Sequence, residues 1–295
     1  MSNPIKNRYE FVLLYDIENG NPNGDPDAGN MPRIDPETGY GIVTDVCLKR
    51  KIRNFVEIVQ ADKPGYKIYI KENTPLNVQH KEAYIATNTP VPTNEDERQA
   101  IRKNAAKIQE LRQWMCCNFF DVRTFGAVMN TDVPAGIVRG PIQINFSRSI
   151  DPIVQQEVTI TRVTVTEEDQ DKTTEMGRKY IVPYGLYRVE GYVSAKLAND
   201  PNKGTGFSEE DLELFWDALI NMFEHDHSAA RGKMATRKLV VFKHDSELGN
   251  APSHTLFELV QVSKKDGVIP RKFDDYTVTV NKDSVPQGVT LIEKL

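Results

Sequence analysis

The sequence contains little cysteine and has no long apolar segment. Cysteine occurs only as Cys47, Cys116 and Cys117 among 295 residues, so the chain can build neither a disulfide framework nor a Cys-x-x-Cys zinc site. No apolar stretch approaches the roughly 20 residues that span a bilayer, and the first residues do not have the pattern of a signal peptide. We therefore expect no membrane insertion and a location in the reducing cytoplasm.

The motifs of common enzymes are also missing. The sequence has no GxxxxGKS/T, GxSxG or HExxH motif, which argues against an NTPase and against the common hydrolases. His225 and His227 flank Asp226, but this pair lacks a third metal ligand at a suitable spacing. We therefore predict no catalytic residue, no metal and no other cofactor.

Charge is distributed unevenly along this acidic chain, whose formal net charge is −5. Residues 227–243 contain five lysines and arginines, Arg231 and Lys233 among them, and no acidic residue, whereas residues 207–226 contain seven acidic residues and no lysine or arginine. The segregation predicts a cationic groove on one side of the protein and an anionic surface elsewhere. A chance clustering of surface charges would give the same pattern.

The first sixty residues carry the strongest signals. An apolar strand is expected over residues 8–17, followed by a loop rich in Asn, Pro, Gly and Asp and by a helix over residues 44–55. Apolar residues recur on one face of this helix, and Lys49, Arg50 and Arg53 belong to a cluster of four cations in five positions. Because Lys49 and Arg53 are one turn apart, they could meet successive phosphates of one strand. The alternative is an ordinary solvated helix face.

The remaining pattern predicts an α+β fold. We expect strands over residues 66–71, 137–146, 158–166, 179–196 and 238–242, a helix over residues 94–120, and a second helix that Ser208 and Asp211 cap. The strand over residues 179–196 should be interrupted at Pro183 and Gly185. Two β-α-β units in this order give the ferredoxin-like plan that RNA-recognition motifs also use.

Three segments carry a family resemblance. Residues 9–54, the run Asp121-Val122-Arg123-Thr124-Phe125-Gly126-Ala127-Val128 and the run Gly140-Pro141-Ile142-Gln143 closely resemble the backbone subunit of CRISPR type I-C Cascade, the Csd family of the RAMP superfamily. The resemblance implies one elaborated RRM-like domain. Its palm core would cover about residues 1–72, 121–146 and 185–265, with a helical insertion at 73–120, a protruding β-hairpin thumb at 147–184 and a C-terminal segment at 266–295.

The resemblance also implies a function without catalysis. Copies of the subunit would polymerise along CRISPR guide RNA as a helical filament, together with other Cascade subunits, and would present the spacer for pairing with target DNA in antiviral defence. The thumb, whose polar tip covers residues 167–178, would place Met176, Arg178 and Lys179 against the RNA. No partner in a membrane is implied.

Residue chemistry adds further candidates for RNA binding. Arg123 could bind a phosphate, Phe125 could stack on a base, and Gly126 would let the RNA backbone approach, although a buried Phe125 at a strand-to-loop junction is the alternative. The complete set of candidates is Lys49, Arg50, Arg53, Arg123, Phe125, Gly126, Arg139, Met176, Arg178, Lys179, Arg231 and Lys233.

Two other classes of function remain open. A metal-dependent RNA endonuclease could use the loop aspartates Asp25, Asp27 and Asp35, but aspartates in such a loop also suit turns, where the carboxylate accepts a hydrogen bond from a nearby backbone N–H, and we favour the turns. A metabolic enzyme on the same scaffold would need a nucleophile or base in a convergent pocket, and the sequence suggests none.

Overall fold

The computed structural model describes residues 3–164 and 175–295. Its helices are α1 (Asp45–Val59), α2 (Leu76–Ala86), α3 (Glu95–Lys103), α4 (Ala105–Asn118), α5 (Phe120–Phe125), α6 (Ala195–Asn199), α7 (Glu209–Asn221) and α8 (Ser253–Phe257). Its strands are β1 (Tyr9–Gly20), β2 (Gly24–Asp25), β3 (Met31–Pro32), β4 (Tyr40–Val43), β5 (Gly126–Met129), β6 (Gly136–Arg139), β7 (Ile142–Ile144), β8 (Ser147–Pro152), β9 (Gln156–Arg162), β10 (Glu175–Val193), β11 (Lys233–His244), β12 (Val260–Lys264), β13 (Tyr276–Val280) and β14 (Val289–Glu293). The α+β class is confirmed.

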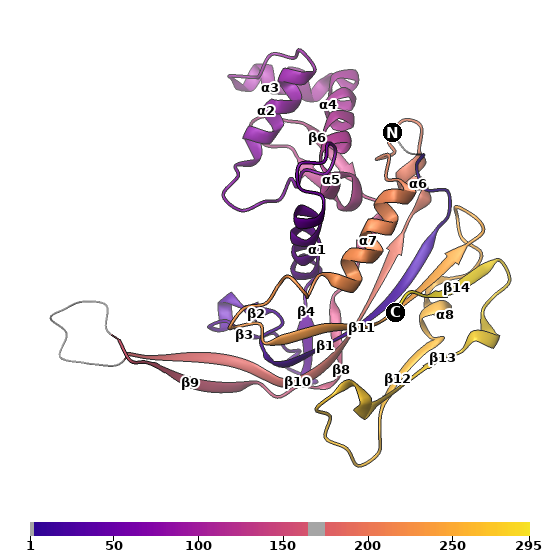
Figure 1. The fold of residues 1–295 in the computed structure, drawn as a ribbon. Helices are drawn as coiled ribbons and strands as arrows, with labels where there is room; N and C mark the ends of the chain where they lie inside the picture. The colour runs from indigo at the N-terminus through magenta and orange to yellow at the C-terminus, as the bar shows by residue number, and fades with distance from the viewer. Residues whose placement is uncertain (1–2, 165–174) are drawn as a thin grey trace.

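One large antiparallel sheet organises the chain (Figure 1). Its strands follow the order β14-β11-β1-β10-β8-β4, and β7 and β9 also pair with β10. Strand β1 lies between two long partners, since Tyr9 is opposite Val193 of β10 and Lys243 of β11. Side chains alternate across a strand, so Phe11 packs with α1 and α7 while Val12 packs with α8, β12 and β13. The sheet therefore has a core on each face.

Helices α1 and α7 begin where the sequence predicts. Thr44 accepts a hydrogen bond from the N–H of Cys47 at 3.3 Å and caps α1. Ser208 and Asp211 form a capping box at the start of α7, in which each side chain accepts from the backbone N–H of the other residue. The apolar face of α7 then packs Trp216 against Phe11, with ring centroids 5.4 Å apart.

A helical subdomain made of α2 to α5 and the β5–β6 ribbon stands apart from the sheet, beyond α1 (Figure 1). The prediction of one helix over residues 94–120 is wrong, because Asn104 ends α3 and its side chain caps α4 by accepting from the N–H of Lys107. The cap of α3 is Asn94, whose side chain accepts from the N–H of Glu97 at 2.9 Å. The strand predicted over residues 66–71 is reduced to an isolated bridge between Lys67 and Phe119.

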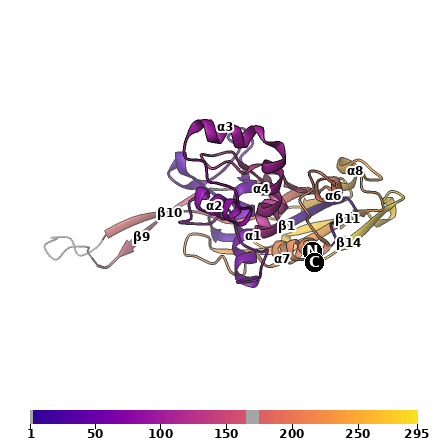
Figure 2. The ribbon, with the colours of Figure 1, turned by 90° about the horizontal axis from the view of Figure 1, so that it is seen from above.

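Strands β9 and β10 form a long hairpin that projects from the body (Figures 1 and 2). Contrary to prediction, β10 continues through Pro183 and Gly185. Pro183 lies beyond the last residue of β10 that pairs with β9. On the other side it lies opposite Asn19, where the pairing between β1 and β10 skips one residue. Asn19 has a φ of 53°. No neighbouring strand needs its missing N–H there, so the proline does not break the strand. The part of the predicted tip at residues 167–174 lies outside the described residues.

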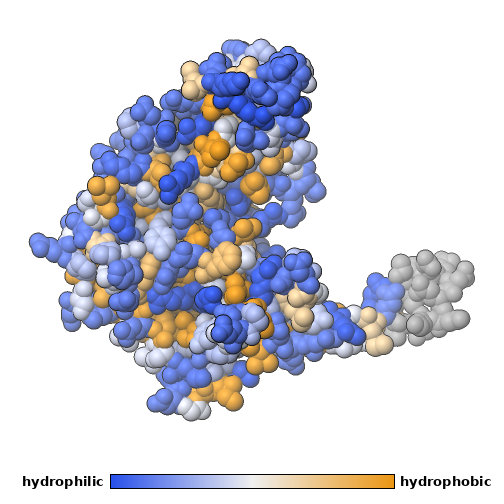
Figure 3. All heavy atoms as spheres, turned by 180° about the vertical axis from the view of Figure 1, so that it is seen from behind, coloured by the Kyte–Doolittle hydropathy of each residue, from blue (hydrophilic) through white to orange (hydrophobic). Residues whose placement is uncertain are grey.

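Polar residues cover most of one face of the molecule (Figure 3). The face in Figure 3 is mainly hydrophilic, with apolar side chains in scattered groups. No helix in the part of the chain that the structure describes is both long and apolar enough to cross a bilayer.

His80 is a buried, titratable residue of the helical subdomain. Its ring is fully buried, with Nδ1 2.7 Å from the carbonyl oxygen of Val133 and Nε2 2.8 Å from the hydroxyl of Tyr69. Because a carbonyl can only accept, Nδ1 carries the proton, and Nε2 accepts from Tyr69. Burial lowers the pKa of His80 below its usual 6.5, although the bond to Val133 opposes the shift.

We predict that this histidine makes the protein less stable in mild acid. Below the unfolded pKa the unfolded chain binds the proton and the folded chain does not, so the free energy of unfolding falls as the pH drops from about 7.5 toward the folded pKa. Thermal unfolding from pH 7.5 to 5.5 should show a smaller pH dependence in His80→Phe than in the parent. The exposed His227 provides the control His227→Gln, and equal pH dependence in all three proteins would contradict the prediction.

Candidate functional site

The structure separates the predicted RNA-binding residues into three groups. Lys49, Arg50, Arg53, Arg123, Phe125, Gly126 and Arg139 lie around α1, α5 and the β5–β6 ribbon. Lys179, Arg231 and Lys233 lie where the base of the hairpin meets the loop after α7. Met176 and Arg178 lie further out on β10.

Two of the predicted phosphate ligands are buried in ion pairs. Arg53 Nε is 2.7 Å from Asp121 Oδ2, and Asp121 also accepts from the backbone N–H groups of Tyr69 and Ile70. Arg123 forms a bidentate pair with Asp211 at 2.7 and 2.9 Å. Arg53 is 8% exposed and Arg123 is 7% exposed. In this geometry neither guanidinium faces solvent. Turning either one toward a phosphate would leave a buried carboxylate unpaired, which is strongly unfavourable.

Phe125 and Gly126 also serve the interior. Phe125 is buried between Lys49, Arg53 and Phe215, so the structure agrees with the alternative of a buried ring, although Phe125 ends helix α5 and is not at a strand-to-loop junction. Gly126 has a φ of 80°, and a side chain there would collide with the backbone of β6. The missing side chain of Gly126 therefore lets another segment of the protein approach closely.

Acidic partners neutralise most of the cationic helix. Lys49 pairs with Asp45 at 2.8 Å, and Arg50 pairs with Glu72. These partners therefore reduce the free positive charge that the sequence predicts on α1. Arg139, at the end of β6, is exposed and forms no ion pair with any residue that the structure describes.

The same pairing alters the expected segregation of charge. In the basic segment, Arg231 pairs with Asp226, Lys233 with Glu18, and Lys238 with Glu293. In the acidic segment, Asp211 pairs with Arg123. Part of the charge in each segment is therefore neutralised by partners of opposite sign.

The base of the hairpin nevertheless gathers three cations, of which Lys233 is exposed and Lys179 and Arg231 are partly exposed. Lys179 Nζ donates to the carbonyl of Ala229 at 3.0 Å, which joins β10 to the loop before β11. Lys233 is 67% exposed and lies 3.3 Å from Glu18. Gly20 contacts the backbone of Arg231 so closely that a Cβ would collide with it. Lysines from two strands and one arginine therefore meet at the end of β1.

One buried cation supports this loop and was missed by the sequence analysis. Lys51 is 1% exposed and pairs with Asp226, which also binds Arg231 at 3.1 Å. Burial lowers the pKa of Lys51, although nearby Cys47 and Asp226 oppose the shift. The available signal was its helical spacing, three residues after Leu48 and four before Phe55, which places Lys51 on the buried face.

The loop aspartates take part in turns. Asp25 accepts from the N–H of Asp27 and pairs with Arg33 at 3.4 Å. Asp35 accepts from the N–H of Glu37 and pairs with Arg148 at 3.0 Å. Across residues 3–164 and 175–295, no group of three or more His, Cys, Asp and Glu side chains is arranged to hold a metal ion.

Comparison with known proteins gives consistent matches. A curated relative, the CRISPR-associated protein Cas7 of Haloferax volcanii, is 26% identical over 294 residues, which cover 94% of this chain and 81% of the relative. A chain described as "CRISPR RNA-guided surveillance complex, pre-nicking" has a TM-score of 0.48 at 14% identity and covers 80% of this chain and 78% of its own length. Another, described as "CRISPR RNA-guided surveillance complex", has a TM-score of 0.46 at 15% identity, with coverages of 88% and 77%.

The family model described as "CRISPR-associated protein Cas7" matches residues 7–281, nearly the whole chain. The resemblance to a RAMP-type backbone family is confirmed at this level. This chain therefore belongs to the CRISPR-associated Cas7 family.

Proposed function

We propose that this protein is a non-catalytic backbone subunit that binds CRISPR guide RNA in a type I-C Cascade complex. Membership of the Cas7 family over residues 7–281 carries this proposal. Copies line up along the RNA and leave the spacer free to pair with target DNA. Since base pairing then reads the sequence, the protein contacts phosphate and sugar.

The arrangement of the core supports a ferredoxin-like, RRM-like palm. Strands β11, β1, β10 and β8 are adjacent in that order and antiparallel. Helices α1 and α7 pack on the same face through one core. The β9–β10 hairpin, as the proposed thumb, extends β10 beyond this sheet (Figure 1).

Exposure decides which cations we assign to RNA. Exposed ion pairs contribute only about 0–1 kcal/mol, so a phosphate can take the place of the carboxylate at little cost. This criterion retains Arg50, Arg139, Arg178, Lys179 and Lys233. It removes Arg53, Arg123 and Arg231, because the carboxylates of their partners Asp121, Asp211 and Asp226 are at most 10% exposed. Met176, which is 79% exposed on β10, remains a candidate to contact a base.

The salt dependence of RNA binding tests this assignment. If each copy neutralises three phosphates, the plot of log affinity against log salt for single-stranded RNA should have a slope of about −2, and each lost contact should make it shallower by roughly 0.7. We expect this change in Lys179→Ala and in Lys233→Ala. The exposed Lys103 of α3 provides the matched control Lys103→Ala. Slopes equal to that of the parent in both test variants would remove the hairpin base from the RNA site.

The buried pairs should behave differently. Arg123→Met leaves Asp211 buried without its partner, so the free energy of unfolding should fall by about 3–5 kcal/mol, while the salt slope of the folded protein stays unchanged. Urea unfolding measures the first effect and anisotropy of labelled RNA the second. Arg148→Ala, which breaks an exposed pair with Asp35, should cost less than about 1 kcal/mol. A shallower slope in Arg123→Met would restore Arg123 to the RNA site.

The nuclease alternative has a direct test. Labelled single-stranded RNA incubated with the protein and Mn²⁺ or Mg²⁺ should stay intact, because Asp25 and Asp35 are committed to turns and ion pairs. Metal-dependent cleavage by the parent that is lost in Asp25→Ala, Asp27→Ala or Asp35→Ala would show that the subunit is catalytic.

A further inference from the structure

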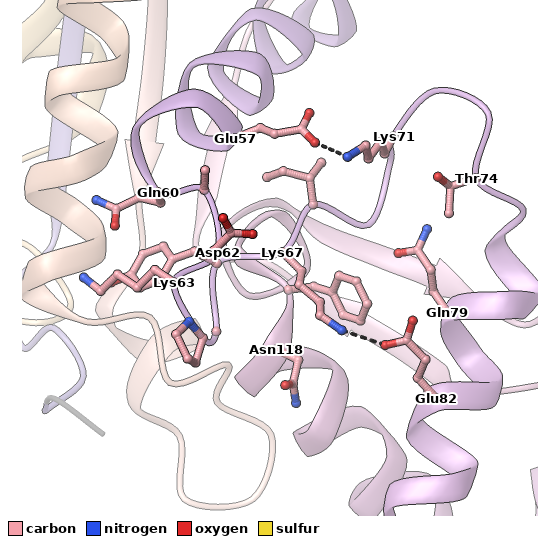
Figure 4. A pocket seen from close by; sticks show the side chains of 16 residues that line it. Glu57, Gln60, Asp62, Lys63, Lys67, Lys71, Thr74, Gln79, Glu82 and Asn118 are labelled. Atoms are coloured by element: carbon pink, nitrogen blue, oxygen red, sulfur yellow. Dashed lines mark hydrogen bonds and ion pairs between the residues drawn. The ribbon is translucent and has the colours of Figure 1, made fainter.

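Two concave regions of the surface differ in how their charges are paired. In the cavity of about 650 Å³ at the C-terminal end of α1, Lys71 pairs with Glu57 (Figure 4). Lys67 pairs there with Glu82, so each lysine has its own carboxylate and the cavity favours a ligand of neither sign. A groove of about 490 Å³ along β14, at one end of the large sheet (Figure 1), has instead a surplus of positive charge.

Two lysines share one carboxylate at this groove. Glu293 Oε1 is 2.6 Å from Nζ of Lys282, and Glu293 also pairs with Lys238 of β11. Glu293 and Lys282 line the groove. Lys282 is 65% exposed, whereas Glu293 is 28% exposed. Because Glu293 keeps Lys238 as a partner, Lys282 can turn to another anion at little cost.

The backbone edge of β14 is open, unlike the opposite edge of the same sheet. The sheet ends at β14 and at β4. The outer edge of β4 is covered, since the N–H of Ile42 donates to the carbonyl of Arg33 at 2.9 Å. Ile34 forms a further bridge with Gly41. None of the described strands pairs with the outer edge of β14, and unpaired backbone groups at an edge are a template for another strand.

The pairing with β11 fixes which residues of β14 face outward. The N–H of Lys294 donates to the carbonyl of Leu239 in β11 at 2.9 Å. In an antiparallel pair every second residue is bonded to the partner strand, so Ile292 also faces β11. Leu291 and Glu293 therefore direct their N–H and C=O groups away from β11. No turn or loop of the described chain supplies hydrogen bonds to them.

The side chains beside this edge are apolar. Val285, Val289 and Leu291 line the groove and pack against the core formed with α8, β12 and β13. Side chains opposite each other on paired strands are about 5 Å apart. Apolar side chains on an added strand would therefore extend this core.

We propose that β14 is extended by one strand that a partner protein supplies, and that this strand carries apolar side chains and one acidic side chain at alternate positions. Its backbone pairs with the outward groups of Leu291 and Glu293. Its apolar side chains contact Val289 and Leu291, and its acidic side chain pairs with Lys282. In this mode of recognition the main chain gives affinity and the alternate side chains give specificity.

A second copy of the chain suits this edge less well. Two β14 strands paired with each other would bring together two sets of Lys238, Lys282 and Glu293, each with more lysines than carboxylates. Such pairing is also two-fold symmetric, whereas copies that follow one RNA strand are related head to tail. The charge at the edge therefore selects an acidic partner.

The test follows the backbone amides of the ¹⁵N-labelled full chain during titration with acetyl-Thr-Val-Thr-Val-Thr-Asp-Thr-amide. In the free protein, hydrogen exchange should be fast at Leu291 and Glu293 and slow at Ile292. We expect the peptide to slow exchange at Leu291 and Glu293 in a saturable way. The same peptide methylated at every backbone nitrogen cannot donate and should have no effect. No protection by the first peptide, or equal protection by the methylated one, would overturn the proposal.

Two variants separate the backbone contribution from the charge. Leu291→Pro removes one outward N–H and leaves the bonds to β11 intact, so it should bind the peptide about two- to tenfold more weakly than Leu291→Ala, the range for one hydrogen bond. Lys282→Gln should weaken binding by about two- to fivefold. Its matched control is Lys272→Gln, since Lys272 is 67% exposed and lies outside the groove. Equal affinities within either pair of variants would count against the site.

The two other occupants of this edge have their own signatures. Sedimentation of the chain alone shows whether a second copy pairs there, and a dimer that Leu291→Pro abolishes would overturn the proposal of a separate partner. Phe242, opposite Leu291, is nine residues further along β11 than Lys233, a distance of about 30 Å. Guide-RNA binding should therefore be the same in all these variants, so failure here and failure of the proposed RNA role are distinguishable.

Discussion

The burial of positive charge on α1 is the constraint on which the site depends. Lys51 and Arg53 are almost completely removed from water, and an unpaired charge there would cost several kcal/mol. Their carboxylate partners are Asp226, in the loop after α7, and Asp121, in α5. The helix can therefore settle on the sheet only when segments about 70 and 175 residues further along the chain have also folded. Charge pairing thus links folding of the core to placement of α5 and of the loop after α7.

This constraint also bears on how an acidic chain would offer the proposed site for RNA. Most cations of α1 are committed to internal acids, so the cations available to a phosphate lie where carboxylate partners are exposed and weakly bound, as for Lys233 and Glu18. A few such contacts give low affinity for one copy. Affinity can still be high if many copies share one RNA strand, because each additional contact is then intramolecular. A net charge of −5 is compatible with this arrangement.

The sequence predicted those features that depend on neighbouring residues. The start of α1 at the predicted position, the capping box at Ser208 and the apolar strand β1 all follow from local chemistry. The break at Asn104 was missed because the apolar spacing continues across it, although the asparagine cap was visible. The burial of Arg53 and Arg123 could not be predicted, since periodicity does not reveal which acid a distant segment will supply. Gly126 stays a predicted RNA contact, although the structure places the β6 backbone against it.

Helix α5 shows why these distant pairs matter more than local propensity. With six residues it is far shorter than the roughly 12–15 residues that an isolated helix needs. Yet it holds Asp121 toward Arg53 of α1 and Arg123 toward Asp211 of α7. Residues two apart in a helix project about 200° from each other, so one short turn can bind two helices on opposite sides. The orientation of the helical subdomain against the sheet then depends on two buried ion pairs, and the exposed Arg139, on the ribbon that α5 leads into, is positioned by them.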